Sequence, residues 1–318
     1  MTIAPPSPRR AACLLAPLAL FAAAPSGAAQ PSAPFTVGEH GYATLAEAVA
    51  AIGSGDGTIL IAPGTYRQCA VQTAGAIAYR AATPGSVTFD GAICEGKAAL
   101  VLRGRAASIE GLIFQNLRVP DGNGAGIRLE HGDLSIADSL FRASEEGILA
   151  GDDPEGTIAI DRTTFSRLGR CDRGLSCAHS LYVGHYGRLI VTRSRFEAGN
   201  GGHYLKTRSA RVEIADNSFD DSHGHLTNYM IDLSNGATGT ISGNIMVQGR
   251  DKENHSAFIT VAPEGRERSS AGLVVRGNSA SLAPGLSWST TFLANWTDDR
   301  ILLTGNRIAS GITPTDRR

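Results

Sequence analysis

The sequence predicts an all-β fold, a single-stranded right-handed parallel β-helix of about ten coils with a short capping helix at its N-terminal end. Three observations lead to this prediction. A pattern of apolar residues recurs every 23 to 34 residues, there are 38 glycines in 318 residues, and aromatic residues make up only 6%. Average proteins contain about 7% glycine, so this composition indicates many tight turns rather than a large helical core.

The repeat is an aliphatic residue followed five positions later by Phe or another apolar residue. The pairs are Ile109 and Phe114, Ile136 and Phe141, Ile160 and Phe165, Val191 and Phe196, Ile214 and Phe219, Ile241 and Met246, Val275 and Ala280, and Leu303 and Ile308. From the fifth pair onward an Asn lies between the two members, namely Asn217, Asn244, Asn278 and Asn306. Asn tolerates the left-handed backbone of a sharp bend. We expect these side chains to stack in a hydrogen-bonded ladder.

A second strand precedes each pair by about ten residues. Several of these segments alternate apolar with polar residues, as in the stretch from Ile231 to Ser234, which is typical of a strand with one buried face. The skeleton of a leucine-rich repeat is absent, and a propeller blade would be longer, with antiparallel strands. Short strands joined by Gly or Asn bends therefore favour a parallel β-helix.

The first 29 residues predict a secretory signal peptide. Arg9 and Arg10 form a positive segment, residues 11–24 are apolar, and residues 25–29 supply small side chains for cleavage. The arginine pair is a weak twin-arginine signal, and we expect Sec export. No later segment reaches about 18 uninterrupted apolar residues, so we expect no membrane span. The expected organisation is a signal peptide at 1–29 and a periplasmic or secreted β-helix domain at 30–318.

Four cysteines remain after residue 29, and an even number in an exported protein predicts disulfides. Cys171 and Cys177 bracket a short loop and are expected to pair with each other, which leaves Cys69 to pair with Cys94. A zinc site is the competing interpretation, although no C-x-x-C pair is present.

Two segments near the N-terminus carry a family resemblance. Residues 59–66, Ile-Leu-Ile-Ala-Pro-Gly-Thr-Tyr, and residues 84–91, Pro-Gly-Ser-Val-Thr-Phe-Asp-Gly, resemble the opening coils of pectin-lyase-like β-helix proteins. Upstream, residues 45–52 form an amphipathic pattern that would cap the open end of the helix. The resemblance extends over residues 36–310, and the chain looks most like a polysaccharide-lyase-type member. The resemblance implies the fold. It does not by itself imply an activity, because a fold does not fix function.

Stacking the repeat places polar residues side by side, because equivalent positions in successive coils lie about 4.8 Å apart. If the first residue of each second strand faces inward, Val183, Lys206 and Asp232 face outward on three adjacent coils. His185 and Arg208 face outward two residues further along. A row at the strand entrance adds His179, His203, Asn228 with Tyr229, and His255; six of the eight histidines fall between residues 179 and 255. This clustering predicts a functional site.

The predicted chemistry is β-elimination on a uronic-acid glycan. Arg208 would clamp the substrate carboxylate, which acidifies the adjacent C5 proton. Lys206 is the leading base, with His203, Tyr229 and His185 as further candidates for base or acid. Residues 204–209, Tyr-Leu-Lys-Thr-Arg-Ser, are similar to the lysine-bearing strand of the alginate and chondroitin lyase group, which implies a lyase and possible use of calcium. The expected substrate-binding residues are Arg208, Asp232, His179, Asn228, His255, Tyr182, Arg128 and Trp296.

Three other functions could use the same outward residues. Hydrolysis would need paired carboxylates, for which Asp152-Asp153 and His223-Gly-His225 are only fragments. Uronate C5 epimerisation begins with the same proton abstraction. A non-catalytic glycan-binding protein would present a row of aromatic residues, and only Trp296 qualifies. The formal net charge of -1 argues against nucleic-acid binding, and we expect a monomer whose partner is an acidic polysaccharide.

The basic residues are 26 arginines and three lysines, Lys97, Lys206 and Lys252. We expect Lys97 and Lys252 to lie in loops between coils, where exposure is sufficient to explain them. Lys206 is expected on a strand in the middle of the polar cluster. Arginine stays charged at neutral pH, whereas the protonation of lysine can be tuned by its neighbours, so Lys206 is the residue to test first.

Overall fold

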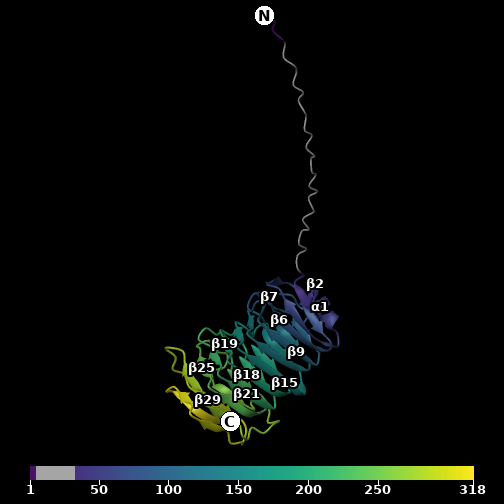
Figure 1. Cartoon of the computed structure of the whole chain (residues 1–318). Helices are drawn as coiled ribbons and strands as arrows, with labels where there is room; N and C mark the ends of the chain where they lie inside the picture. The colour runs from purple at the N-terminus through teal and green to yellow at the C-terminus, as the bar shows by residue number, and fades with distance from the viewer. Residues whose placement is uncertain (5–32) are drawn as a thin grey trace. The chain divides into compact units, whose positions relative to one another are not determined.

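The computed structural model describes residues 1–4 and 33–318. The predicted signal peptide lies almost entirely outside the described residues. Residues 33–318 form one unit, a right-handed parallel β-helix of about nine turns (Figure 1). Within the described residues, no helix has both the length and the apolar character needed to cross a membrane.

Three sheets run along the β-helix, and each coil contributes a strand to each sheet in turn. Sheet A has twelve strands, in spatial order β2 (His40–Tyr42), β1 (Phe35–Val37), β3 (Asp56–Ile61), β6 (Ala76–Ala81), β9 (Ala106–Glu110), β12 (Asp133–Ala137), β15 (Asp153–Asp161), β18 (Tyr186–Thr192), β21 (Arg211–Ala215), β24 (Thr238–Ser242), β27 (Val274–Arg276) and β30 (Leu302–Thr304).

Sheets B and C have ten strands each, close to the ten coils expected. Sheet B contains β4 (Gly64–Tyr66), β7 (Val87–Asp90), β10 (Leu112–Gln115), β13 (Leu140–Arg142), β16 (Thr164–Ser166), β19 (Arg195–Glu197), β22 (Ser218–Asp220), β25 (Ile245–Gln248), β28 (Ser279–Leu282) and β31 (Arg307–Ile308). Sheet C contains β5 (Ala70–Gln72), β8 (Ala98–Leu102), β11 (Ala125–Leu129), β14 (Glu146–Ala150), β17 (Leu181–Val183), β20 (Leu205–Thr207), β23 (Ile231–Leu233), β26 (Ala257–Val261), β29 (Thr290–Asn295) and β32 (Ile312–Arg317).

The predicted capping helix is present as α1 (Leu45–Ile52). Thr44 begins it with a capping box, in which the Thr44 side chain accepts from the Glu47 backbone N–H and the Glu47 side chain accepts from that of Thr44. The helix buries Leu45, Ala48 and Val49 against the first coil. The antiparallel pair β1 and β2 lies beside it and extends sheet A. These elements cover the N-terminal end of the β-helix, whose open strand edges would otherwise invite pairing.

The interior is ordered by two ladders, of which the sequence predicted the one formed by Asn residues. Phenylalanine rings stack from coil to coil, with centroids 4.7 Å apart between Phe165 and Phe196 and 4.8 Å apart between Phe196 and Phe219. At the neighbouring bend, the Asn217 side chain donates to Asn244 Oδ1 over 3.0 Å, and Asn244 donates to Asn278 over 2.9 Å. The ladder continues to Asn306. These contacts keep successive coils in register, so an outward residue in one coil meets its equivalent in the next.

Both predicted disulfides are present. Cys69 pairs with Cys94 near the N-terminal end, and Cys171 pairs with Cys177 in the loop before β17. The competing zinc interpretation of these cysteines is therefore wrong, because all four sulfurs are used in disulfide bonds.

Candidate active site on sheet C

The outer face of sheet C carries one continuous row of side chains. Backbone pairing aligns Arg128, Leu149, Tyr182, Lys206, Asp232, Thr260 and Ala294 on successive coils. The residues on either side of these positions, such as Leu181, Leu205 and Ile231, pack in the core. The prediction that Lys206 and Asp232 are adjacent outward residues is confirmed.

The predicted row was wrong at one coil, where its register was displaced by one residue. Val183 was expected beside Lys206, but it is fully buried in the core, and Tyr182 takes the outward position. The same shift places Gly184, not His185, level with Arg208. Because side chains alternate between the two faces of a strand, a slip of one residue exchanges all of them. Leu181, Tyr182 and Val183 are all apolar enough to face inward, so the alternation alone could not set the register.

Lys206 is covered rather than exposed, with 7% of its side chain accessible. Its Nζ donates to Asp232 Oδ2 over 3.2 Å and to Glu264 Oε1. Asp232 itself is 1% exposed and also accepts hydrogen bonds from the hydroxyls of Ser234 and Thr260, each over 2.9 Å. Burial raises the pKa of Asp232, against the opposing effect of Lys206 and the two hydroxyls.

Arg208 lies two residues further along the strand direction and shares the same carboxylate. Its Nε donates to the Tyr182 hydroxyl over 3.0 Å, and its two terminal nitrogens donate to Asn235 Oδ1 and Glu264 Oε2. Partial burial would raise the pKa of Glu264, but the hydrogen bonds from Lys206 and Arg208 prevail and lower it to about 2. Glu264 is therefore ionised at neutral pH, bridging the two cations.

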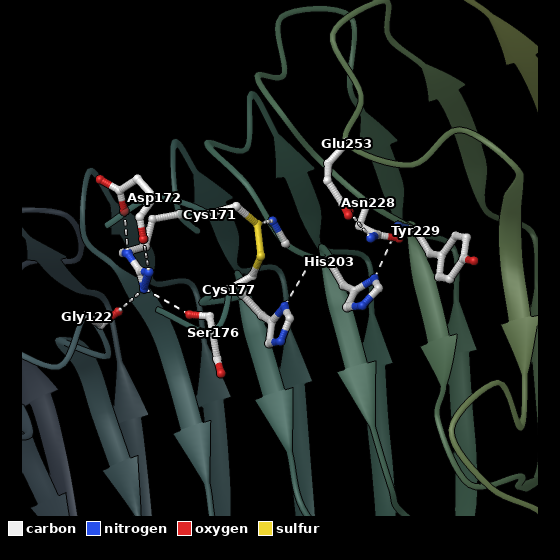
Figure 2. The surroundings of a disulfide bond; sticks show 12 residues. Gly122, Cys171, Asp172, Ser176, Cys177, His203, Asn228, Tyr229 and Glu253 are labelled. Carbon is white, nitrogen blue, oxygen red and sulfur yellow. Dashed lines mark hydrogen bonds and ion pairs between the residues drawn. A yellow bond between two sulfur atoms is a disulfide. The ribbon is translucent and has the colours of Figure 1, made fainter. Parts of the chain in front are cut away.

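A second row lies at the entrance of the strands, two residues before the core positions Leu181, Leu205 and Ile231. Its members are His179, His203 and Tyr229. The rings stack, with centroids 5.0 Å apart between His179 and His203 and 5.4 Å apart between His203 and Tyr229. Figure 2 shows His203 and Tyr229 side by side at the start of adjacent strands, near the disulfide between Cys171 and Cys177.

Backbone contacts fix the protonation of both histidine rings. His179 Nδ1 accepts the backbone N–H of His203 over 3.0 Å, and His203 Nδ1 accepts that of Tyr229 over 3.2 Å. Burial lowers the pKa of His203 to about 3, assisted by the charge of Lys206, and it also lowers the pKa of His179. Both rings are therefore neutral at pH 7 and carry the proton on Nε2. His203 Nε2 lies 3.7 Å from Asp232 Oδ2.

Glu146 occupies the same row on the preceding coil, and it was not predicted. Its Oε1 accepts the backbone N–H of His179 over 3.2 Å, while its Oε2 is buried and has no hydrogen-bond partner. Burial raises the pKa of Glu146 to about 8. Glu146, His179 and His203 are thus neutral at pH 7, and their row lies beside Lys206 and Arg208.

Five predicted residues lie apart from Lys206 and its two carboxylates. His185 binds Asp152 through Nδ1 over 3.0 Å and Glu267 through Nε2 over 3.1 Å. His255 stacks on Trp288, and Trp296 lies under the guanidinium of Arg318. Asn228 donates to Glu253, as Figure 2 shows. Arg128 shares the row of Lys206 but lies three coils away, beyond Leu149 and Tyr182, and its Nε is buried without a hydrogen-bond partner.

Lys252 is the clearest correction to the sequence interpretation. It does lie between coils, but its side chain is only 1% exposed and its Nζ is 3.2 Å from Asp221 Oδ2. Glu264 is the main omission. It lies in a long connection after β26 whose charged residues follow no repeat, so periodicity could not place it against Lys206, 58 positions earlier.

Calcium remains an expectation from the resemblance alone. Among residues 1–4 and 33–318, no three His, Cys, Asp or Glu side chains are grouped so that they could hold a metal ion. The carboxylates near Lys206 bind cationic side chains instead. The site does not fit a resident calcium ion, and no step of the chemistry is assigned to one.

Comparison with known proteins supports the fold. No protein-family model matches the sequence, and no curated protein matches it. Among solved structures, the chain is similar to a pectin methylesterase from Aspergillus niger, with 14% identity, 90% of each chain covered and a TM-score of 0.51. It is also similar to the PL6 family alginate lyase AlyGC, with 13% identity and a TM-score of 0.50 over 81% of this chain, which spans 40% of that enzyme. The predicted right-handed parallel β-helix fold is thereby confirmed.

Proposed function

We propose that the protein is an exported polysaccharide lyase that cleaves an acidic, uronic-acid-containing glycan by β-elimination. The observation that carries this proposal is the carboxylate bound jointly by Lys206 and Arg208 on the outer face of sheet C. A uronate presents the same group, and arginine is well suited to neutralise it. The names of the two similar structures refer to pectin and alginate, and both are uronic-acid polymers.

In the proposed reaction, Arg208 binds the substrate carboxylate and so acidifies the proton on C5. Lys206 Nζ removes that proton, the C4–O4 bond breaks, and a C4=C5 double bond forms. For this step the amine must be neutral. Asp232 lies 3.2 Å from Nζ, and its raised pKa suits it to take up the ammonium proton.

The departing O4 needs a proton, and Tyr229 is the candidate that the geometry favours. Its hydroxyl oxygen accepts from Asn254 Nδ2 over 2.9 Å, and its own proton has only the long contact to Ser256 Oγ, over 3.4 Å, to give up when it donates to the substrate. His203 is neutral with its proton on Nε2, so we assign it the role of a hydrogen-bond donor to substrate rather than that of the base. His179 offers an equivalent donor one coil away.

The test measures ultraviolet absorbance of the new double bond on alginate, pectate, hyaluronan and chondroitin, with dextran as a neutral control. We expect absorbance to rise on at least one acidic polymer. Lys206→Ala and Lys206→Arg should each lower kcat by about 10²- to 10⁴-fold, because arginine keeps the charge but is a poor base. Lys97→Ala is the matched control, because Lys97 is a partly exposed lysine that binds Glu130 outside the site. A Lys206→Arg protein with full rate would exclude Lys206 as the base.

Hydrolysis is the second candidate, because Asp232 and Glu264 both bind Lys206 Nζ while their pKa values are shifted in opposite directions. Such a pair resembles the acid and the base of a glycosidase. New reducing ends without ultraviolet absorbance would favour hydrolysis over elimination. Binding of polymer without any product would favour a glycan-binding protein.

Export to the periplasm or medium is part of the proposal. The two disulfides support it, because such bonds persist in oxidising compartments. N-terminal sequencing of the mature protein should find a start near residue 30.

A further inference from the structure

Glu264 is held across the proposed site by its own backbone. After β26 the chain bends at Ala262, whose φ is +57°, and the Glu264 backbone N–H donates to Ser234 O over 3.1 Å. Four residues later, the Arg268 backbone N–H donates to Asn235 O over 3.0 Å. The Ala262 backbone N–H also donates to Leu233 O over 2.8 Å, so the connection is held to the coil of Asp232 on both sides of Glu264, whose side chain reaches Lys206 and Arg208.

The carboxylate of Glu264 bridges the two cations with separate oxygens, Oε1 to Lys206 and Oε2 to Arg208. It is also the outermost member of the group. Its side chain is 40% exposed, against 7% for Lys206 and 19% for Arg208. A molecule that approaches from solvent therefore meets Glu264 before either cation, and neither cation can bind a second carboxylate in that position while Glu264 remains.

We propose that Glu264 is an internal occupant of the carboxylate-binding site, and that the carboxylate of a uronate displaces it. The inference rests on the proposed function for the identity of the ligand, but not on the reaction that follows. The exchange preserves the two charge-assisted hydrogen bonds, since one carboxylate replaces another. The anchored backbone can stay in place, because rotation of the side chain alone would free Lys206 and Arg208.

The test is the affinity for D-galacturonate and D-glucuronate, measured by isothermal titration calorimetry, with D-galactose as the uncharged control. Glu264→Gln removes the competing charge and should raise uronate affinity at least about 5-fold, because a site blocked by its own residue loses affinity in proportion to the blocked fraction. Glu264→Asp, too short to reach both cations, should also raise it. Glu213→Gln alters a carboxylate bound to Arg188 on sheet A and should change nothing.

Unchanged or weaker uronate binding in both Glu264 variants would overturn the proposal, as would the absence of uronate binding in every protein. Circular dichroism and thermal unfolding verify that each variant is folded. The result is separable from the proposed function. Tighter uronate binding by the Glu264 variants, without elimination on any polymer, would support displacement of Glu264 and reject the lyase function. Elimination by the wild type, with unchanged uronate affinity in Glu264→Gln, would support the lyase function and reject displacement of Glu264.

Discussion

Two buried lysine–aspartate pairs occupy neighbouring coils, and their surroundings differ. Lys206 with Asp232 and Lys252 with Asp221 each have an N–O distance of 3.2 Å, and both aspartates are at most 1% exposed. Around Lys252 the remaining partners are internal. Asp221 also accepts from Tyr204, Thr227 and the Gly249 backbone, and Lys252 donates to Thr227 and to the Asn228 carbonyl.

Around Lys206 the outer partner is exchangeable. The amine reaches past Asp232 to Glu264, a half-exposed side chain that also binds Arg208. The same pair of residue types is therefore structural where the chain closes over it, and available for chemistry where one partner faces solvent. Burial of a lysine alone does not distinguish these cases; the exposure of its last partner does.

The largest difference is expected when each lysine is replaced by methionine. Lys252→Met leaves Asp221 charged and sealed, and should lower the free energy of unfolding by about 3–5 kcal/mol. Lys206→Met should cost clearly less, because the raised pKa of Asp232 lets this carboxyl take up a proton when the lysine is absent. Urea denaturation of both variants measures the difference. Equal losses would show that the pair at Lys206 is as structural as the one at Lys252.

The two disulfides extend the comparison to covalent contacts. By loop length, removing the link between Cys69 and Cys94, 25 residues apart, should cost about 3.5 kcal/mol, and removing that between Cys171 and Cys177, six apart, about 2 kcal/mol. The second pair lies near the site, since Cys171 Sγ accepts the backbone N–H of Gly202, next to His203. We expect the Cys171→Ala/Cys177→Ala protein to lose more activity, and the Cys69→Ala/Cys94→Ala protein to lose more stability. The opposite ranking would show that the short disulfide does not support the site.

The repeating parts of the structure could be predicted from the sequence, because equivalent residues make the same contact in each successive coil. The Asn ladder from Asn217 to Asn306 and the adjacency of Lys206 and Asp232 both follow from stacking coils in register. The errors occur where the repeat is interrupted. An insertion that contains Cys171 and Cys177 precedes β17, and there the register of Tyr182 was misplaced by one.

Long connections between coils are the second source of error. Lys252 was predicted to be exposed because it lies in one, yet the connection folds back so that Lys252 pairs with Asp221, 31 positions earlier. Glu264 comes from the next connection, and nothing local marks it as a partner of Lys206. Such contacts depend on the position that a non-repeating loop takes in the folded chain, and the repeat pattern of the sequence does not specify that position.

The last comparison concerns two adjacent acids at one strand entrance, whose effect at any single pH step is small. Glu145 is buried, but its Oε2 accepts the backbone N–H groups of Val119 and Gly124, each over 2.9 Å, and its Oε1 binds Arg173. Glu146 has an unpartnered Oε2, and burial raises its pKa to about 8 from an ordinary value of 4.5. Glu146 therefore holds its proton in the folded protein at a pH where the unfolded chain has released it.

The sign of the pH effect follows from this difference. The stability contributed by protonated Glu146 is complete below pH 4.5 and is lost as the pH rises toward 8, with a slope of at most about 1.4 kcal/mol per pH unit. Glu146→Gln should flatten this part of the stability profile measured by urea denaturation, whereas Glu145→Gln should lower stability and leave the slope in place. A wild-type profile with no fall between pH 5 and 8 would mean that Glu146 finds a partner for its second oxygen, and the neutral row beside Lys206 would then begin at His179.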